Sequence, residues 1–242
     1  MREKVSISLD KEILEKADAT VDGIAVRNRS QAIEHALRAY FGSSGVEKAF
    51  VLLGRSRNIK EAHLNHLIGM AKSVGVKEIL IAGGPNNEKI FQILGSGSKY
   101  GIKVDYVEEK ELKGTAGSIW LAKNMLDSTF LVIAGDTSFT FDLIKMVEFH
   151  KSKGSMVTMG VTAVKLEDST DSIILEGEKV VHFNYQDKKP TYMTNAGVYL
   201  FEPEIFRHMP SKGSLEKDVF PGLAKEGKLY AYVFYREWKH NE

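Results

Sequence analysis

The chain has 242 residues and a formal net charge of +1, from 33 Lys and Arg against 32 Asp and Glu. It has no cysteine, which excludes a disulfide framework, a thiolate metal site and a cysteine nucleophile. No apolar run approaches the roughly 18–20 residues that span a bilayer, and the N-terminal residues do not resemble a signal peptide, so we expect a cytoplasmic protein without a membrane partner.

The first forty or so residues predict a small separate module. Residues 3–9 alternate between apolar and polar side chains, which predicts a strand with one apolar face. Asp10 can cap a following helix, and Asn28 can cap a second helix that continues to Phe41. Residues 42–45 are typical of a linker. One strand and two helices bury too little surface to fold alone, so we expect a dimer in which two copies of the strand pair.

This pattern resembles the ribbon-helix-helix family of DNA-binding regulators over residues 2–41. The resemblance implies a paired ribbon in the major groove of DNA, with the second helix start against a phosphate. The open alternative is a dimerisation handle alone, because residues 1–42 carry 7 basic and 7 acidic residues. The DNA-binding residues implied by the resemblance are Arg2, Lys4, Ser6, Ser8, Arg27, Asn28, Arg29 and Ser30.

From residue 46 the chain predicts a second, larger α/β domain, so the predicted domains are 1–42 and 46–242. Alternating strands and helices imply a mainly parallel, doubly wound sheet, which binds ligands beyond the carboxyl ends of its strands. After residue 155 strands dominate, and we expect an antiparallel extension of the same sheet. The predicted strands are 49–53, 77–82, 102–107, 130–134, 156–163, 172–184, 196–201 and 229–235, and the predicted helices are 59–74, 85–94 and 116–126.

Two motifs in this domain indicate chemistry. Gly114-Thr-Ala-Gly117 enters a predicted helix, where glycine permits close backbone approach and free amides can accept an anion or a base edge. Asp136 follows a buried strand, which is a common position for a metal ligand. A carboxylate in that position can also simply cap a turn, but the two motifs together are more specific than either alone.

These motifs resemble those of the sugar nucleotidyltransferases, also called nucleotide-sugar pyrophosphorylases, over roughly residues 47–238. The resemblance implies that residues 114–117 contact a base, that Asp136 binds a metal, and that Lys189 contacts a phosphate. It also implies that Asn195 and Gly197 lie beside the sugar and that Glu216 faces the sugar hydroxyls. The predicted ligand-binding residues are Gly54, Arg55, Arg57, Gly114, Thr115, Ala116, Gly117, Asp136, Lys189, Asn195, Gly197 and Glu216.

The sequence departs from the family pattern at two places. The first strand runs through Gly54, Arg55 and Arg57 almost directly into the next helix, without the family's longer triphosphate loop. His240 stands where the family has its second metal carboxylate. Asp136 and His240 would together make an incomplete Mg²⁺ site, because Mg²⁺ prefers oxygen ligands, so we assign no certain cofactor and no catalytic residue.

These departures lead us to expect a transcription regulator that binds DNA as a homodimer or tetramer. Its catalytically defective domain, a pseudoenzyme, would sense a nucleotide or nucleotide-sugar. The alternative is an active sugar-1-phosphate nucleotidyltransferase with an added dimerisation arm, and a third hypothesis is a scaffold that binds neither ligand. His63 and His66 suit a metal by their spacing on a helix but lack a third ligand, so we expect them to be solvated.

Overall fold

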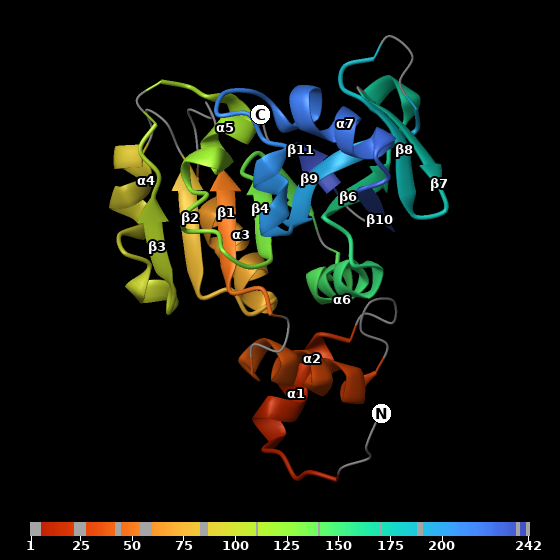
Figure 1. Cartoon of the computed structure of the whole chain (residues 1–242). Helices are drawn as coiled ribbons and strands as arrows, with labels where there is room; N and C mark the ends of the chain where they lie inside the picture. The colour runs from red at the N-terminus through yellow and green to blue at the C-terminus, as the bar shows by residue number, and fades with distance from the viewer. Residues whose placement is uncertain are drawn as a thin grey trace.

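The computed structural model describes residues 6–21, 28–41, 45–53, 60–82, 87–109, 111–139, 141–169, 171–187, 191–235 and 238–240. Figure 1 shows a large α/β body, built on one sheet, with a small pair of helices beneath it at the N-terminal end of the chain. Among the helices described, none is both long and apolar enough to cross a membrane.

The N-terminal pair consists of α1 (Lys11–Ala19) and α2 (Arg29–Phe41). Both predicted caps are confirmed. The carboxylate of Asp10 accepts a hydrogen bond from the backbone of Glu12 at 2.8 Å, and the amide oxygen of Asn28 accepts one from the backbone of Gln31 at 3.0 Å. Residues 6–10 form no strand, which differs from the prediction for 3–9. A strand needs a hydrogen-bonded neighbouring strand, and none of the described residues supplies one to residues 6–10.

The first half of the body confirms the predicted alternation of strands and helices. Strands β1, β2, β3 and β4 are mutually parallel, in the spatial order β3-β2-β1-β4. Their bounds are Lys48–Leu52, Glu78–Ala82, Lys103–Tyr106 and Phe130–Ala134, and the intervening helices are α3 (Glu61–Ser73), α4 (Asn87–Leu94) and α5 (Gly114–Leu121). The carboxyl ends of β1 and β4 therefore meet at one edge of the sheet.

The second half extends the sheet to nine strands, in the order β3-β2-β1-β4-β9-β6-β10-β8-β7. Strand β9 is antiparallel to both of its neighbours, so the sheet is mixed. The predicted strand 172–184 is instead a hairpin, because Gly177 adopts a φ of +61° and turns the chain. The bounds are β6 (Val157–Ala163), β7 (Ser172–Glu176), β8 (Lys179–Asn184), β9 (Met193–Phe201) and β10 (Leu229–Phe234).

Several elements were not predicted from the sequence. Strands β5 (Thr137–Phe139) and β11 (Trp238–His240) form a separate two-stranded sheet. The unpredicted helices are α6 (Leu143–Lys153), α7 (Phe220–Lys225), the 3₁₀ turns Ser98–Tyr100, Leu166–Asp168 and Pro203–Arg207, and a π-helical turn, Leu215–Val219. At the start of the π-helical turn, the Ser214 side chain accepts a hydrogen bond from the backbone N–H of Glu216. This bond fixes the backbone from which the Glu216 carboxylate projects.

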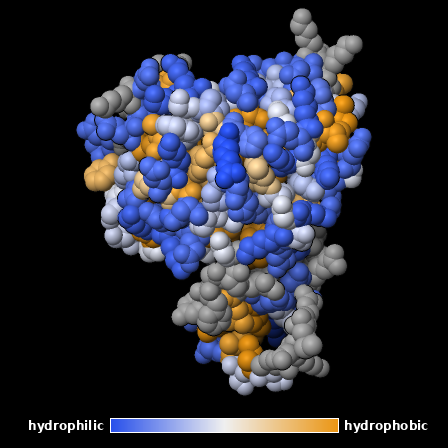
Figure 2. All heavy atoms as spheres, in the orientation of Figure 1, coloured by the Kyte–Doolittle hydropathy of each residue, from blue (hydrophilic) through white to orange (hydrophobic). Residues whose placement is uncertain are grey.

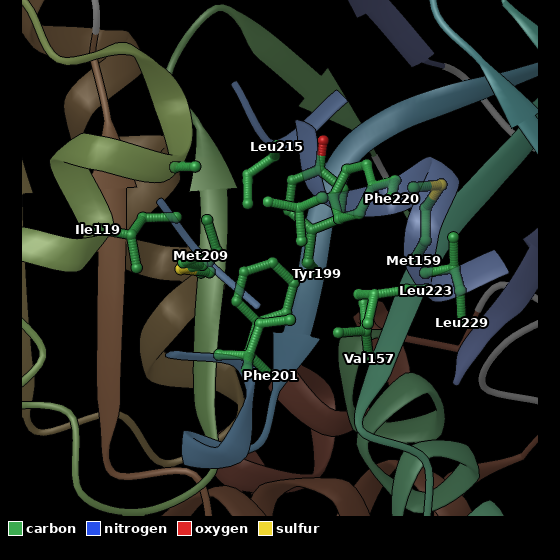
Figure 3. Packing of buried hydrophobic residues seen from close by; sticks show 14 of the residues in the cluster. Ile119, Val157, Met159, Tyr199, Phe201, Met209, Leu215, Phe220, Leu223 and Leu229 are labelled. Atoms are coloured by element: carbon green, nitrogen blue, oxygen red, sulfur yellow. The ribbon is translucent and has the colours of Figure 1, made fainter. Parts of the chain in front are cut away.

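Two apolar clusters pack against the two faces of the sheet. Figure 3 shows the cluster on the face covered by α5 and α7, where Tyr199 and Phe201 of β9 pack against Phe220. The Tyr199 and Phe220 ring centroids are 5.2 Å apart, and Tyr199 is only 2% exposed. Because β9 lies in the middle of the sheet, this packing fixes the strand that carries the predicted sugar-side residues.

Candidate functional site

A tight turn at the end of β4 carries Asp136. The backbone N–H of Gly135 donates to the carbonyl of Leu52, at the end of β1, over 2.7 Å. Gly135 is buried, and a Cβ there would overlap the side chain of Leu53. The Thr137 hydroxyl donates to the carbonyl of Ala134 at 2.8 Å and closes the turn from the other side. The exposed side chain of Asp136 therefore projects from a backbone that these hydrogen bonds hold at the carboxyl edge of the sheet.

The two glycines at the start of α5 allow close approach by another segment of the same chain. Gly114 has a φ of +76°, and a Cβ there would overlap the carbonyl oxygen of Gly213. That oxygen accepts hydrogen bonds from the backbone N–H groups of Ala116 at 3.1 Å and Gly117 at 3.4 Å. The expectation that these amides are free for a ligand is therefore wrong, since Gly213 already occupies them.

Thr115 joins the predicted base-contacting loop to the predicted sugar-side carboxylate. Its hydroxyl donates to Glu216 Oε2 at 2.9 Å and accepts from the backbone N–H of Leu215 at 2.8 Å. Ser214 donates to the same Glu216 oxygen at 2.6 Å. Glu216 is partly buried, so these two donors hold its carboxylate in one orientation at the edge of the site.

An irregularity in β9 places the other sugar-side residues beside the Asp136 turn. The register of β9 against β6 shifts between Met159 and Val161, and Gly197 in the shifted segment has a φ of +72°. A Cβ on Gly197 would lie 2.8 Å from Thr137 Cγ2. Asn195 donates to the Tyr199 hydroxyl at 2.7 Å and accepts from the backbone of Gly197 at 3.0 Å.

Asp171 is a site residue that the sequence analysis missed. It is only 3% exposed, and its Oδ2 accepts from the backbone N–H of Asn195 at 3.1 Å and from the Thr194 hydroxyl at 3.2 Å. It therefore holds the segment that carries Asn195. The only sequence signal was a carboxylate directly before an apolar strand, which is indistinguishable from an ordinary turn residue.

Three carboxylates in this region raise the pKa values of two tyrosines. Burial, followed by the negative charge of Glu216, raises the pKa of Tyr199 well above its ordinary value; Asp171 and Asp136 add to the rise, and the hydrogen bond from Asn195 opposes it. Burial and the same three carboxylates also raise the pKa of Tyr185. Both tyrosines therefore stay neutral at physiological pH, and the site is acidic, which suits hydroxyl donors better than bare phosphates.

The second metal ligand implied by the resemblance is only partly placed. His240 in β11 pairs with Thr137 in β5, so its backbone lies next to the Asp136 turn. The described residues contain no group of three or more His, Asp or Glu side chains arranged to hold a metal ion. Asp136 alone supplies too few ligands for a dedicated Mg²⁺ site, and we derive no step through a metal.

The remaining predicted residues divide into three groups. Arg29 is engaged within the chain, because its Nε and Nη2 donate to the two carboxylate oxygens of Asp18 at 2.7 and 2.6 Å. Ser6, Ser8 and Ser30 are exposed. The predicted residues that lie outside the described part of the chain are Arg2, Lys4, Arg27, Gly54, Arg55, Arg57 and Lys189.

The family model described as Nucleotidyl transferase matches residues 43–239. The mannose-1-phosphate guanylyltransferase catalytic subunit beta of Dictyostelium discoideum is 31% identical over 185 residues, covering 74% of this chain and 52% of that protein. The mannose-1-phosphate guanylyltransferase of Mycobacterium tuberculosis is 30% identical over 184 residues, covering 73% of this chain and 51% of that protein. This chain thus spans about half the length of these curated relatives.

A solved structure supports the same fold. The putative glucose-1-phosphate thymidylyltransferase from Bacillus anthracis superposes with a TM-score of 0.71 at 19% identity, covering 80% of this chain and 89% of that chain. The relatives contradict our expectation of a DNA-binding regulator with a catalytically defective domain, because they are named as transferases. Nothing in the comparisons indicates a ribbon-helix-helix module, and the alternative hypothesis of an active transferase is the one that they favour.

Proposed function

Because the chain belongs to the nucleotidyl transferase family, we propose that it is an active sugar-1-phosphate nucleotidyltransferase. In this reaction a phosphate oxygen of the sugar-1-phosphate attacks the α-phosphorus of a nucleoside triphosphate. The bond from that phosphorus to the bridging oxygen breaks, and pyrophosphate leaves. The observation that carries the proposal is the hydrogen bond between Thr115 and Glu216. It joins the predicted base-contacting loop to the predicted sugar-side carboxylate.

We assign the sugar to the acidic side of this site. The fixed carboxylate of Glu216 can accept a hydrogen bond from a sugar hydroxyl, and Asn195 on β9 offers a second polar side chain. Gly197 has no side chain, so its backbone packs directly against Ala134 and Thr137 of the Asp136 turn. Catalysis of this reaction depends mainly on positioning and on neutralising charge, and Asp136 is the group that the fold presents at the reacting end.

Mannose-1-phosphate and GTP are the first substrate pair to test, because they are the substrates that the names of the relatives imply. The assay measures pyrophosphate release, with other nucleoside triphosphates and sugar-1-phosphates as comparisons. We expect turnover with at least one pair and its loss in Asp136→Asn, which keeps the size of the side chain but removes its charge. Pyrophosphate release no faster than in this variant, for every pair, would refute the proposal.

We further propose that the N-terminal helices serve this enzyme as a dimerisation arm. Helix α1 buries none of its residues, although Ile13 lies on its apolar side. Ile7, Ile13 and Leu37 are all more than 40% exposed, and Figure 2 shows apolar surface on the small part below the body. Exposed apolar side chains on so small a unit favour burial against a second copy.

A further inference from the structure

His63 makes a contact that its sequence did not suggest. It lies in the first turn of α3, and its Nε2 is 2.5 Å from the carbonyl oxygen of Gly135. His63 is partly buried, whereas His66, three residues further along the same helix, is exposed. Because a carbonyl oxygen can only accept, His63 Nε2 must carry the hydrogen of this bond. The expectation that both histidines are merely solvated is therefore wrong for His63.

The carbonyl that His63 contacts directly precedes Asp136. Two further bonds of the turn involve the ends of β1 and β4, because the Gly135 N–H donates to Leu52 and the Thr137 hydroxyl donates to Ala134. His63 adds a bond from a third element, the start of a helix. Rotation of the peptide between Gly135 and Asp136 would break this bond, so the contact restrains the backbone from which the Asp136 carboxylate projects.

We propose that His63 is a positioning residue for Asp136 in the transferase reaction, an inference that rests on the proposed function. Helix α3 begins soon after the segment that contains Arg55 and Arg57, the candidate phosphate ligands nearest to it in the sequence. His63 thus ties the start of this helix to the turn that carries the carboxylate. It holds the backbone of Asp136 in a fixed relation to the first turn of α3.

The test compares His63→Leu, His63→Gln and His66→Leu in the full chain. Leucine removes the hydrogen bond, whereas the Nε2 of glutamine can still donate to the Gly135 carbonyl. We expect His63→Leu to lower kcat by at least about tenfold, as small misplacements of reacting groups do, with little change in KM for the sugar phosphate. His63→Gln should recover kcat to within about threefold of the wild type, and His66→Leu should match the wild type.

A second readout does not depend on turnover. Nitrogen-15 NMR should show His63 in the form protonated at Nε2, and the carboxyl carbon-13 resonance of Asp136 should shift in His63→Leu but not in His66→Leu. His63→Gln should restore that resonance. If the wild type shows these signals but no turnover with any substrate pair, the proposed function fails while the contact stands.

Two results would overturn the positioning role. One is a His63→Leu variant with wild-type kcat and an unchanged Asp136 resonance. The other is a folded His63→Gln variant that is as impaired as His63→Leu, since the hydrogen bond would then not be the cause. If His63→Leu does not fold, the test compares His63→Gln with a matched His66→Gln variant. The measurements are again the Asp136 carboxyl resonance, kcat and KM, and an impaired His63→Gln beside a normal His66→Gln would overturn the role of the hydrogen bond.

Discussion

The hydrogen bonds of Thr115 give a quantitative prediction for Thr115→Val, which replaces the hydroxyl by a methyl group of similar size. The change removes a bond to the charged acceptor Glu216, worth about 1.5–3 kcal/mol, and leaves the Leu215 N–H without its acceptor, which costs about 1–3 kcal/mol. Glu216 is only partly buried and keeps its bond from Ser214, so the lower ends of both ranges apply. We expect the free energy of unfolding to fall by about 2–3 kcal/mol.

For a chain of this length, that loss corresponds to a drop in Tm of roughly 4–12 °C. Urea denaturation and calorimetry measure the two quantities, and Thr115→Ser is the matched control, since it keeps the hydroxyl and should stay within about 1 kcal/mol of the wild type. With Glu216 held by Ser214 alone, KM for the sugar-1-phosphate should rise about tenfold, equivalent to about 1.4 kcal/mol. The reasoning fails if the valine variant is as stable as the wild type, or if the serine variant is equally destabilised.

Two further predictions concern regions away from the site. His150 is buried between Thr158 and Glu202, and burial lowers its pKa below the ordinary 6.5, although the Glu202 carboxylate opposes this. The folded protein then binds fewer protons than the unfolded chain, so this contribution to stability is complete above pH 6.5 and is lost as pH falls through the folded pKa; urea titrations from pH 7.5 to 5 should show a decline that His150→Gln reduces. Ile13→Lys should turn a dimer into a monomer in light scattering while the circular dichroism spectrum is retained, and an unchanged mass would exclude α1 from the interface.

Elements with a strong local pattern could be predicted from the sequence. The apolar run Phe130–Ala134 has the observed bounds of β4, because a strand buried on both faces needs apolar side chains at every position. The caps at Asp10 and Asn28 were also predictable, since each depends on a side chain within three residues of its partner.

Contacts between segments distant in the chain could not be predicted. The β5–β11 ladder pairs Thr137 with His240 through strands of three residues each, which are too short for a periodic signal. His63 lies beside the buried stripe of α3 and bonds a backbone carbonyl that is 72 residues away. A carbonyl is present at every residue, so no side-chain pattern marks the one that a histidine will contact.

The glycines of α5 were identified correctly as points of close approach, but their partner was not. Gly114 and Gly117 leave space that a ligand or a neighbouring loop could fill, and the sequence pattern is the same in both cases. In the structure the carbonyl of Gly213 fills the space at Gly114, and the backbone of Ser211 and Lys212 fills that at Gly117. These contacts bring the segment that carries Glu216 against Thr115, so the glycines contribute to the site by assembling it.

The charge of the site indicates where the phosphate end of a substrate must be neutralised. The negative charges of three carboxylates, Asp136, Asp171 and Glu216, all raise the pKa of Tyr199. A polyphosphate that enters beside these carboxylates therefore needs nearby cations. Two short segments of the sequence carry suitable cations. Arg55 and Arg57 follow Leu53, which packs at Gly135. Lys189 follows Tyr185, whose pKa the same three carboxylates raise. On the far side of Lys189, the backbone of Thr191 donates to the carbonyl of Asp171 at 3.0 Å. Leu53, Tyr185 and Thr191 thus lie near the acidic site, and we expect the cations next to them in the sequence to supply the positive charge that nucleotidyl transfer requires.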